Sequence, residues 1–409
     1  MSDRPIVQGD RARPRVVVLG AGFGGLEVAT TLAREFGAAV DVVLLDAAAG
    51  FVFGFSKLDV MFGKASAEHV VHSYADVARP GLRFVQTTVR GVDPVAKRVT
   101  TDDGTFDADI LVVALGADLD PAATPGLIEG GHDFYSLHSA LALRQVLADF
   151  AGGRVVIGVT STPFKCPPAP SETALLMHDL LDRRGLLASS HVSLVMPLPV
   201  PIPPSPDASR AVLAVFAERG ISWHPGRTVL GLDPGRRVAL LSGGQELAYD
   251  LFLGVPVHRA PRVVVEAGMT VDGWIPVDPM SLETRYPDVY AVGDVTSVGT
   301  PKAGVFAEGQ AAVVAAAIGV RVRGKPVTVT YGGRGVCYME FGHDMIATVD
   351  VTFLPGRPPT GDFAGPSTDL AADKSTFGSE RAERWFSRHW APLPRQGHGV
   401  TPCPVLLAP

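Results

Sequence analysis

An approximate internal duplication limits the folds available to this chain more than any other feature of its sequence. The segment VRGVDPVAKRV at 89–99 returns as VLGLDPGRRV at 229–238. An offset of about 140 residues predicts a second copy of the apolar strand RVVVLG at 15–20, and RVVIGV at 154–159 stands in that place. Since each copy combines buried strands with a helical segment, the repeat predicts two related, doubly wound α/β domains.

The first copy carries a complete dinucleotide-binding pattern. Residues 16–46 run in the order strand, glycine turn, helix, strand and acid. In the turn, Gly20 permits a tight bend, Gly22 lets the backbone approach a pyrophosphate, and Gly25 lets the helix pack on the strand. Asp46 ends the second strand, where a carboxylate accepts hydrogen bonds from ribose hydroxyls. The pattern predicts a Rossmann-like domain with a dinucleotide at the start of its first helix.

Two later segments indicate which dinucleotide this domain binds. FDADILVVALGA at 106–117 and YPDVYAVGDV at 286–295 each place an apolar strand before a turn of small residues. Both resemble motifs of the FAD- and NAD-linked disulfide reductase superfamily, although Leu115 stands where that family usually has threonine. The resemblance implies that the first domain binds FAD. Its cofactor-binding residues would then also include Ala114, Gly116, Gly293 and Asp294, the last binding the flavin ribitol.

The second copy lacks the features that bind a nucleotide. STPFKCPPAP at 161–170 replaces the glycine turn, and its prolines lack an N–H group and restrict the residue before them. We therefore expect the helix only over 171–185. The following strand ends in Pro197, where the first copy has Asp46. We conclude that the second Rossmann-like domain, part of a duplicated FAD/NAD(P)-binding fold, does not bind NAD(P)H.

The repeat and the motifs together predict the domain limits. We expect an N-terminal tail, a discontinuous FAD-binding domain, a second Rossmann-like domain without GxGxxG, and a small C-terminal cap with strands and helices. Their limits are 1–14 for the tail, 15–125 and 255–330 for the FAD-binding domain, 126–254 for the second domain, and 331–409 for the cap.

Two of the three cysteines are candidates for redox chemistry. Cys166 lies beside Lys165 and five residues before the expected helix, so the ammonium and the helix dipole favour its thiolate. Cys337 lies in a strand–turn–strand pattern at 333–353. Each alone is also explained as a small buried apolar residue. Cys403 stands in a terminal tail, either incidental or a mobile resolving thiol.

A closer family resemblance gives these cysteines a role. STPFKCPPAP, GVCYMEFG at 335–342 and PKAGVFAEGQAAVVAAAI at 301–318 resemble the sulfide:quinone oxidoreductases and the flavoprotein subunit of flavocytochrome c sulfide dehydrogenase. The resemblance implies that Cys166 and Cys337 flank the flavin, bridge through sulfur and oxidise sulfide. Lys302 would stabilise the anionic reduced flavin, although it is otherwise explained as an exposed lysine before a helix. The electrons would pass to FAD and on to a quinone.

The chain departs from this family at two places. Many of the quinone reductases carry a third cysteine after the first-domain turn, and residues 116–127 contain none. The flavocytochromes attach FAD through a cysteine in the region matching 51–63, which also contains none. We therefore expect non-covalent FAD, and the sulfur-releasing step and the sulfur substrate stay open.

Composition excludes several other classes of protein. A net charge of −6 without a basic block argues against a nucleic-acid partner. The cysteines are too few and too dispersed for a disulfide scaffold or a clustered metal site. The polar start MSDRPIVQGDRARPR has no apolar signal segment, so we expect a cytoplasmic protein. No uninterrupted apolar stretch reaches about 20 residues, which argues against a spanning helix.

Contact with a membrane surface remains open on sequence grounds. We expect a Pro- and Gly-rich loop at 353–368 and then a short helix at about 378–391. The helix mixes aromatic and arginine residues that suit a bilayer interface: Trp385, Phe386, Trp390, Arg381, Arg384 and Arg388. The alternative is a helix packed on the cap with its arginines in water.

Three functions therefore compete. The leading one is a flavin enzyme that oxidises sulfide, or a related sulfur compound, and reduces a quinone at the inner face of the cell membrane. The second is an NADH:quinone oxidoreductase of the same fold. The third is a flavin-bearing redox sensor whose cysteines change state without turnover. The sequence leaves homo-oligomerisation open.

Overall fold

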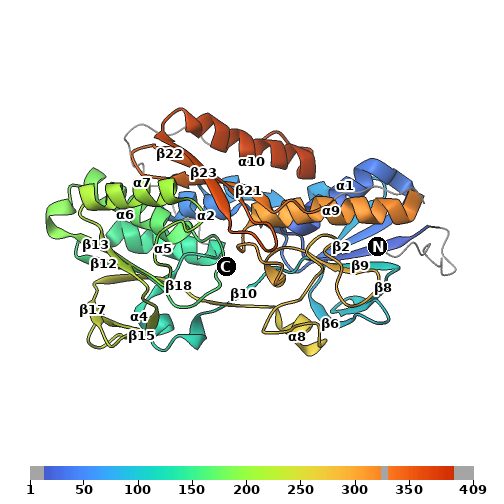
Figure 1. The fold of residues 1–409 in the computed structure, drawn as a ribbon, viewed down its shortest axis with the longest axis horizontal. Helices are drawn as coiled ribbons and strands as arrows, with labels where there is room; N and C mark the ends of the chain where they lie inside the picture. The colour runs from blue at the N-terminus through green and yellow to red at the C-terminus, as the bar shows by residue number, and fades with distance from the viewer. Residues whose placement is uncertain (1–12, 324–329, 391–409) are drawn as a thin grey trace, which may run out of the picture.

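A five-stranded parallel sheet forms the centre of the first domain. The computed structural model describes residues 13–323 and 330–390, and Figure 1 shows two lobes side by side. The strand order is β20 (Val289–Ala291), β9 (Ile110–Val113), β1 (Arg15–Leu19), β2 (Asp41–Asp46) and β5 (Leu82–Gln86). Neighbouring strands are parallel throughout. Since β20 comes far later in the chain than the other four, two separated stretches build this domain.

Both faces of this sheet are covered, which explains why its strands are apolar at successive positions. Val16 and Val18 of β1 pack with α1 (Phe23–Phe36) and α9 (Gly304–Arg323). Val17 and Leu19 point to the opposite face, where they pack with residues that include those of α8 (Arg262–Glu266).

The second lobe repeats this sheet. Its strand order is β11 (His132–Asp133), β18 (Leu251–Val255), β12 (Arg154–Val159), β13 (His191–Met196) and β14 (Ser222–Pro225). These pairs are also parallel. Strand β12 occupies the central place that β1 has in the first sheet. The expected fold of two doubly wound α/β domains is therefore confirmed.

The duplication extends to a backbone irregularity. Each domain has a three-stranded antiparallel sheet, β6 (Val89–Asp93), β7 (Arg98–Thr101) and β8 (Gly104–Asp107) in one and β15 (Val229–Asp233), β16 (Val238–Leu241) and β17 (Glu246–Ala248) in the other. The first strand of each sheet carries a β-bulge before its glycine, Gly91 or Gly231. The following turns contain Lys97 and Arg237, each with φ +52°.

The helices of the second lobe correct one expectation. They are α5 (Leu137–Asp149), α6 (Ala169–Arg183) and α7 (Pro206–Glu218). Helix α6 begins at Ala169 rather than near 171, with Pro168 as its N-cap and Pro170 in its first turn. Proline is tolerated there because the first N–H groups of a helix have no partner within the helix. Cys166 therefore lies three residues before the helix, not five.

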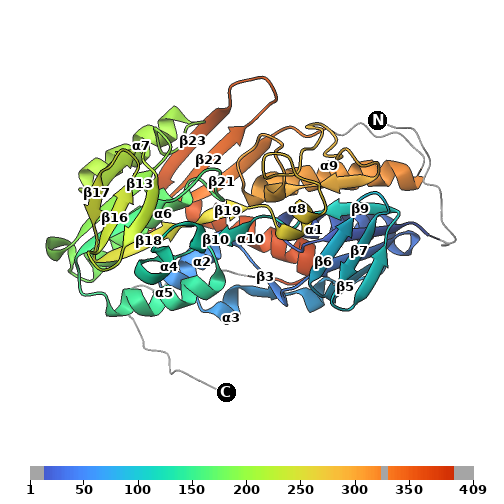
Figure 2. The same cartoon turned by 90° about the horizontal axis from the view of Figure 1, so that it is seen from below.

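Short elements connect the lobes and complete the first domain. β10 (Asp118–Asp120) and β19 (Val257–Arg259) form an antiparallel pair where the chain crosses between the lobes (Figure 2). The remaining short elements used below are β3 (Gly50–Val52), α2 (Gly54–Met61), α3 (Ala67–Val70), β4 (Val71–Ser73), α4 (Leu127–Gly130) and the 3₁₀ turn η5 (Gly293–Val295). α2 of the first domain packs against α5 of the second.

Helix α9 is long and apolar enough to cross a membrane by length and composition. It has 20 residues and a mean hydropathy of 1.5, and 56% of its apolar stretch is buried inside the protein. Its buried side belongs to the core beside α1 and β1. This is the environment of a core helix in a folded domain.

The C-terminal cap is a three-stranded antiparallel sheet with one long helix. Its elements are β21 (Arg334–Glu340), β22 (Ile346–Thr352), β23 (Thr360–Ser367) and α10 (Leu370–Phe386). The strand–turn–strand pattern around Cys337 is confirmed, with β21 and β22 joined at Gly342–Asp344. The expected loop at 353–368 is wrong in its second half, because β23 lies there and pairs with β22. Cys403 and the rest of 391–409 lie outside the described residues, as do residues 1–12 of the tail.

One face of the helix considered for a membrane surface packs on the rest of the protein. α10 starts at Leu370, earlier than expected, and lies across the top of Figure 1. Trp385 and Phe386 are 0% and 2% exposed in the core of the first domain. Arg384 pairs with Glu27 at 3.0 Å, and Arg381 pairs with Glu308 at 2.8 Å. The end of this helix therefore packs on the first domain, and two of its arginines are paired with acids rather than left in water.

Candidate active site

The glycine turn after β1 has the geometry of a dinucleotide cradle. Gly20 has φ +91°, and a Cβ there would lie 2.5 Å from the carbonyl oxygen of Ala114. A Cβ on Gly25 would lie 1.8 Å from the oxygen of Gly20, so helix α1 packs directly on the turn. A Cβ on Gly22 would meet nothing within 4 Å of the described structure. The turn is closed by protein at Gly20 and Gly25 and leaves space for a ligand at Gly22.

Asp46 is placed between this turn and the end of β2. Its Oδ2 accepts a hydrogen bond from the Ala21 N–H at 2.7 Å, and its Oδ1 accepts one from the Ala48 N–H at 2.8 Å. Each carboxylate oxygen has a further lone pair for a hydroxyl donor. Asp46 thus both stabilises the turn and can receive a ribose hydroxyl.

The other predicted cofactor residues lie at the carboxyl ends of neighbouring strands. Ala114 follows β9, and its N–H donates to the Leu19 oxygen at 2.7 Å. Gly116 and Gly293 have φ +68° and +78°, conformations that favour glycine. Asp294 follows Gly293 in η5. Burial raises the pKa of its carboxyl group, and the positive charges of nearby lysines only partly offset this rise. Carboxyl ends of parallel strands are where such folds bind ligands.

The structure brings Cys166 next to Lys302 through the backbone. The Cys166 N–H donates to the Lys302 oxygen at 2.7 Å, and Cys166 has the left-handed φ of +51°. Left-handed backbone at a residue other than glycine is uncommon and clusters at functional sites. Lys302 is only 6% exposed. Its ammonium donates a hydrogen bond to the backbone oxygen of Asp294 at 2.5 Å and lies 3.2 Å from the Trp274 ring centroid. Burial lowers the pKa of Lys302 to about 8.

The sequence predicts a thiolate at Cys166, whereas the surroundings of this residue in the structure raise the pKa of its thiol. Cys166 and Cys337 are both free thiols, with Cys166 exposed and Cys337 half-buried. Dense surrounding protein raises the pKa of Cys166, and the negative charge of Cys337 acts in the same direction. Burial thus opposes the thiolate that the sequence predicts at Cys166.

Sequence analysis missed a buried acid beside both thiols. Glu172, in the first turn of α6, is 4% exposed, and its Oε1 accepts a hydrogen bond from the Glu340 N–H at 2.9 Å. Burial raises the pKa of Glu172 to about 7. Its charge in turn contributes to the raised pKa values of Cys166 and Cys337. The only sequence signal was a glutamate six residues after Cys166, which spacing alone does not distinguish from a surface residue.

Glu340 and two lysines form a charged group behind Glu172. The Glu340 carboxylate accepts hydrogen bonds from both Lys64 and Lys374. The two ammonium groups overcome the effect of burial and hold the pKa of Glu340 well below its usual range. This group joins α10 to β21 and holds that strand beside the start of α6. It thereby fixes Cys337 relative to Cys166.

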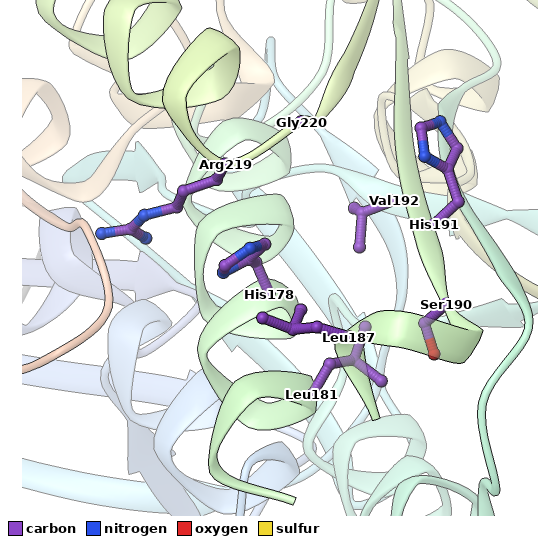
Figure 3. A pocket seen from close by; sticks show the side chains of 8 residues that line it. All are labelled: His178, Leu181, Leu187, Ser190, His191, Val192, Arg219 and Gly220. Carbon is purple, nitrogen blue, oxygen red and sulfur yellow. The ribbon is translucent and has the colours of Figure 1, made fainter. Parts of the chain in front are cut away.

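A separate hollow of about 120 Å³ lies at the end of the second sheet where β13 begins. Figure 3 shows Leu181, Leu187 and Val192 on its walls, with the His178 ring between Leu187 and Arg219. The Arg219 guanidinium points away from His191 toward the cap, where it donates to the Phe341 oxygen. Cys166 follows the carboxyl end of β12, whereas this hollow lies at the amino end of the parallel strand β13. The hollow is therefore separate from Cys166.

The site region contains groups suited to thiol redox chemistry. These are two free thiols, a buried acid whose pKa lies near neutral pH, and a buried ammonium. Among residues 13–323 and 330–390, no group of three or more His, Cys, Asp and Glu side chains could hold a metal ion.

Comparison with known proteins supports this chemistry. The mitochondrial sulfide:quinone oxidoreductase of Mus musculus is 24% identical, covering 83% of this chain and 79% of its own. An NADH dehydrogenase-like protein of Mycobacterium tuberculosis is 29% identical, covering 69% of this chain and 73% of its own. The X-ray structure of the sulfide:quinone oxidoreductase from Aquifex aeolicus superposes with a TM-score of 0.79 at 22% identity, covering 95% of this chain and all of that chain.

These similarities confirm the resemblance to sulfide:quinone oxidoreductases that the motifs around Cys166, Cys337 and Lys302 indicated. The match to a family description extends over both α/β domains and ends within α9. Since residues 14–319 match the pyridine nucleotide-disulphide oxidoreductases, this chain belongs to that family of oxidoreductases.

Proposed function

We propose that this chain is an FAD-dependent enzyme that oxidises hydrosulfide through Cys166 and Cys337 and passes two electrons to a quinone. The observation that carries the proposal is the backbone hydrogen bond from Cys166 to Lys302, whose ammonium in turn donates to the backbone oxygen of Asp294. The names of the relatives from Mus musculus and Aquifex aeolicus support the same substrates.

FAD fits the residues of the first domain, and we propose that it is bound without a covalent link. The glycine turn would hold the pyrophosphate at Gly22, Asp46 would hold a ribose hydroxyl, and Asp294 would hold the ribitol. The Lys302 ammonium would stabilise negative charge on the reduced ring. When bound, FAD supplies the acceptor for two electrons, and the sulfur exchange belongs to the cysteines.

The sulfur steps balance with two cysteines. Hydrosulfide attacks the Cys166–Cys337 disulfide, breaking the S–S bond and leaving one cysteine as a persulfide and the other as a thiolate. Loss of two electrons and one proton joins these as a trisulfide. A second hydrosulfide then removes the middle sulfur as a hydropersulfide anion and restores the disulfide. Glu172 can hold the proton released in this cycle, because its pKa of about 7 lies near working pH.

A half-buried aromatic group suits the quinone. The ring centroids of Phe55 and Phe377 lie 6.1 Å apart, and those of Tyr338 and Phe377 lie 5.5 Å apart. Tyr338 follows Cys337 in β21 and therefore points to the opposite face of the strand. Accessible aromatic faces stack on flat, apolar rings. We propose that the quinone binds here and is collected by peripheral contact of a cytoplasmic protein with the membrane.

Anaerobic mixing with sulfide tests the function. We expect the FAD-loaded protein to lose its oxidised-flavin absorbance, and a Cys166→Ser/Cys337→Ser double variant to keep it, because the double variant cannot form the disulfide. Photochemical reduction, which needs neither cysteine, should bleach both proteins. Bleaching by sulfide that survives replacement of both cysteines would refute the proposed thiol route.

Steady turnover separates an enzyme from a sensor. With sulfide and a soluble quinone analogue, we expect continuous quinone reduction by the native protein. Stoichiometric flavin reduction without continuing turnover would instead favour a flavin-bearing redox sensor. The NADH dehydrogenase-like relative from Mycobacterium tuberculosis supports NADH:quinone oxidoreduction as the second candidate function. Anaerobic mixing with NADH in place of sulfide separates the two candidates, because an NADH oxidoreductase would reduce its flavin.

A further inference from the structure

Trp274 presents the face of its indole ring to the Lys302 ammonium. The Nζ atom of Lys302 lies 3.2 Å from the Trp274 ring centroid. The same atom donates hydrogen bonds to the backbone oxygens of Asp294 at 2.5 Å and Thr296 at 3.3 Å. An ammonium group has three N–H donors. Within the described structure, two carbonyl oxygens and one aromatic face thus surround this ammonium.

The backbone determines where the indole ring lies. Val271 and Trp274 exchange two backbone hydrogen bonds, of 2.8 and 3.1 Å, which close a tight turn. The next residue, Ile275, forms a parallel β-bridge with Thr296, whose oxygen binds the Lys302 ammonium. Trp274 and this carbonyl oxygen therefore belong to one hydrogen-bonded unit, which fixes the ring relative to the ammonium.

The charge of the ammonium depends on these contacts because Lys302 is buried. Burial lowers the pKa of Lys302 to about 8, with Asp294 opposing this shift and Lys165 adding to it. A carbonyl oxygen and the negative face of an aromatic ring both favour the charged form of a lysine. The contribution of an aromatic face is largest for a cation removed from water, and tryptophan provides the best such face. Loss of the ring should therefore favour the neutral amine.

We propose that Trp274 is a positioning residue for Lys302, whose ammonium it keeps charged and in place, so that the flavin becomes a stronger electron acceptor. The presence of the flavin beside Lys302 rests on the proposed function, whereas the contact between ring and ammonium belongs to the structure itself. Two-electron reduction places negative charge on the flavin ring, and a fixed positive charge nearby stabilises that charge.

The midpoint potential of the bound FAD tests this role without sulfide or quinone. All proteins would carry Cys166→Ser and Cys337→Ser, so that only the flavin takes up electrons in an anaerobic spectroelectrochemical titration. We expect Trp274→Leu to lower the equilibrium constant for reduction about tenfold, a fall of about 30 mV in the potential. Trp274→Phe keeps an aromatic face and should lose less. Trp223→Leu removes a half-buried indole from β14 of the second domain and should leave the potential unchanged.

A double-mutant cycle shows whether the effect passes through Lys302. Lys302→Met alone should lower the potential at least as much as Trp274→Leu does. In the Lys302→Met protein, Trp274→Leu should cause no further fall, because no ammonium is left for the ring to hold. An equal fall with and without Lys302 would refute the positioning role and assign the effect of Trp274 to packing.

A second measurement keeps the shape of the ring and changes its charge distribution. Growth on fluorinated tryptophan withdraws electron density from the ring face and weakens a cation–π contact. The labelled protein should have a lower potential than the unlabelled protein. The same labelling of Trp274→Phe, which places fluorine only on the other tryptophans, is the control and should cause no fall. This comparison decides the question even if Trp274→Leu does not retain FAD.

The result can overturn this inference separately from the proposed function. A potential that is unchanged in Trp274→Leu, or that falls equally on labelling with and without Trp274, refutes the positioning role even if sulfide bleaches the flavin. A flavin that sulfide does not bleach in the native protein refutes the proposed function. A tenfold effect of Trp274 that disappears in Lys302→Met would still establish Trp274 as the positioning residue.

Discussion

Glu172 is the residue whose charge most directly connects protonation to the two thiols. It is buried at the start of α6, and its pKa of about 7 means that it becomes negatively charged as the pH rises through neutrality. Burial and then the Glu172 charge raise the pKa of Cys337 to about 12. Ionised Glu172 thus opposes formation of a thiolate at Cys337, whereas protonated Glu172 does not.

Replacement of Glu172 should make the Cys337 thiol easier to ionise. In Glu172→Gln, we expect the pH profile of Cys337 alkylation by iodoacetamide to move down by about one pH unit, because a buried negative charge is lost. The difference from the native protein should appear only above pH about 7, where native Glu172 is ionised. Mass spectrometry of the Cys337 peptide measures the profile. Glu129→Gln, in α4, is the control, and a profile unchanged in both variants would contradict the assigned coupling.

Sequence could identify the chemistry-bearing residues but not their surroundings. Gly20, Gly22 and Gly25 were predictable because a glycine turn is a local pattern with a local physical cause. The protonation of Cys166 was not, since the sequence shows Lys165 and a following helix but does not show the burial that outweighs them.

Helix α10 is the element that fastens the cap to the first domain. Its Trp385 donates from Nε1 to the Glu27 carboxylate at 2.7 Å. The Trp385 ring meets the rings of Phe23 and Phe51, each at a centroid distance of 5.5 Å. Arg384 binds the same carboxylate at 3.0 Å. Glu27 is thus a buried acid. In the described part of the chain, the ion pair of its carboxylate is formed with α10.

Truncation of Trp385 should destabilise the protein strongly. We expect Trp385→Ala to lower the free energy of unfolding by about 3–5 kcal/mol, through a large cavity and the lost partner of Glu27. Arg388→Ala removes an exposed ion pair with Asp76 from the residues after the helix and should cost less than about 1 kcal/mol. Urea unfolding of both variants provides the comparison. Equal, small effects would mean that α10 does not fasten the cap.

The same element shows why amphipathic composition alone left two interpretations of this helix open. Trp385, Phe386 and Arg384 suit a bilayer interface and a buried helix end equally well, because both place aromatic rings beside charged groups. The decision depends on whether acids such as Glu27 and Glu308 face the helix, which is a tertiary property. The predicted start of α6 was wrong for a related reason. Pro168 and Pro170 are compatible with the first turn of a helix as well as with a loop.

The whole molecule contains a duplicated domain, in which one copy has a glycine turn after its central strand and the other has a loop with a cysteine. The order of strands and even the bulge before Gly91 and Gly231 are shared. The copies differ at the turn after the central strand, β1 in one and β12 in the other. At that turn, the first domain presents Gly22 and the second presents Cys166. Duplication could be predicted from the sequence because turns and strands repeat locally, whereas the hydrogen bond between Cys166 and Lys302, which are far apart in the chain, could not.

This division of labour predicts that NADH is not a reductant. At the start of α6, the Ala169 N–H already donates to the Cys166 oxygen at 2.9 Å, Pro170 has no N–H, and Glu172 places a carboxyl in the first turn. A pyrophosphate there would find few donors and, above pH about 7, a like charge. We expect anaerobic NADH to leave the flavin of the native protein oxidised under conditions in which sulfide bleaches it within the same mixing experiment. Rapid bleaching by NADH, and none by sulfide, would reverse the assignment and make the chain an NADH oxidoreductase, because electrons would then enter through the second domain rather than through the thiols.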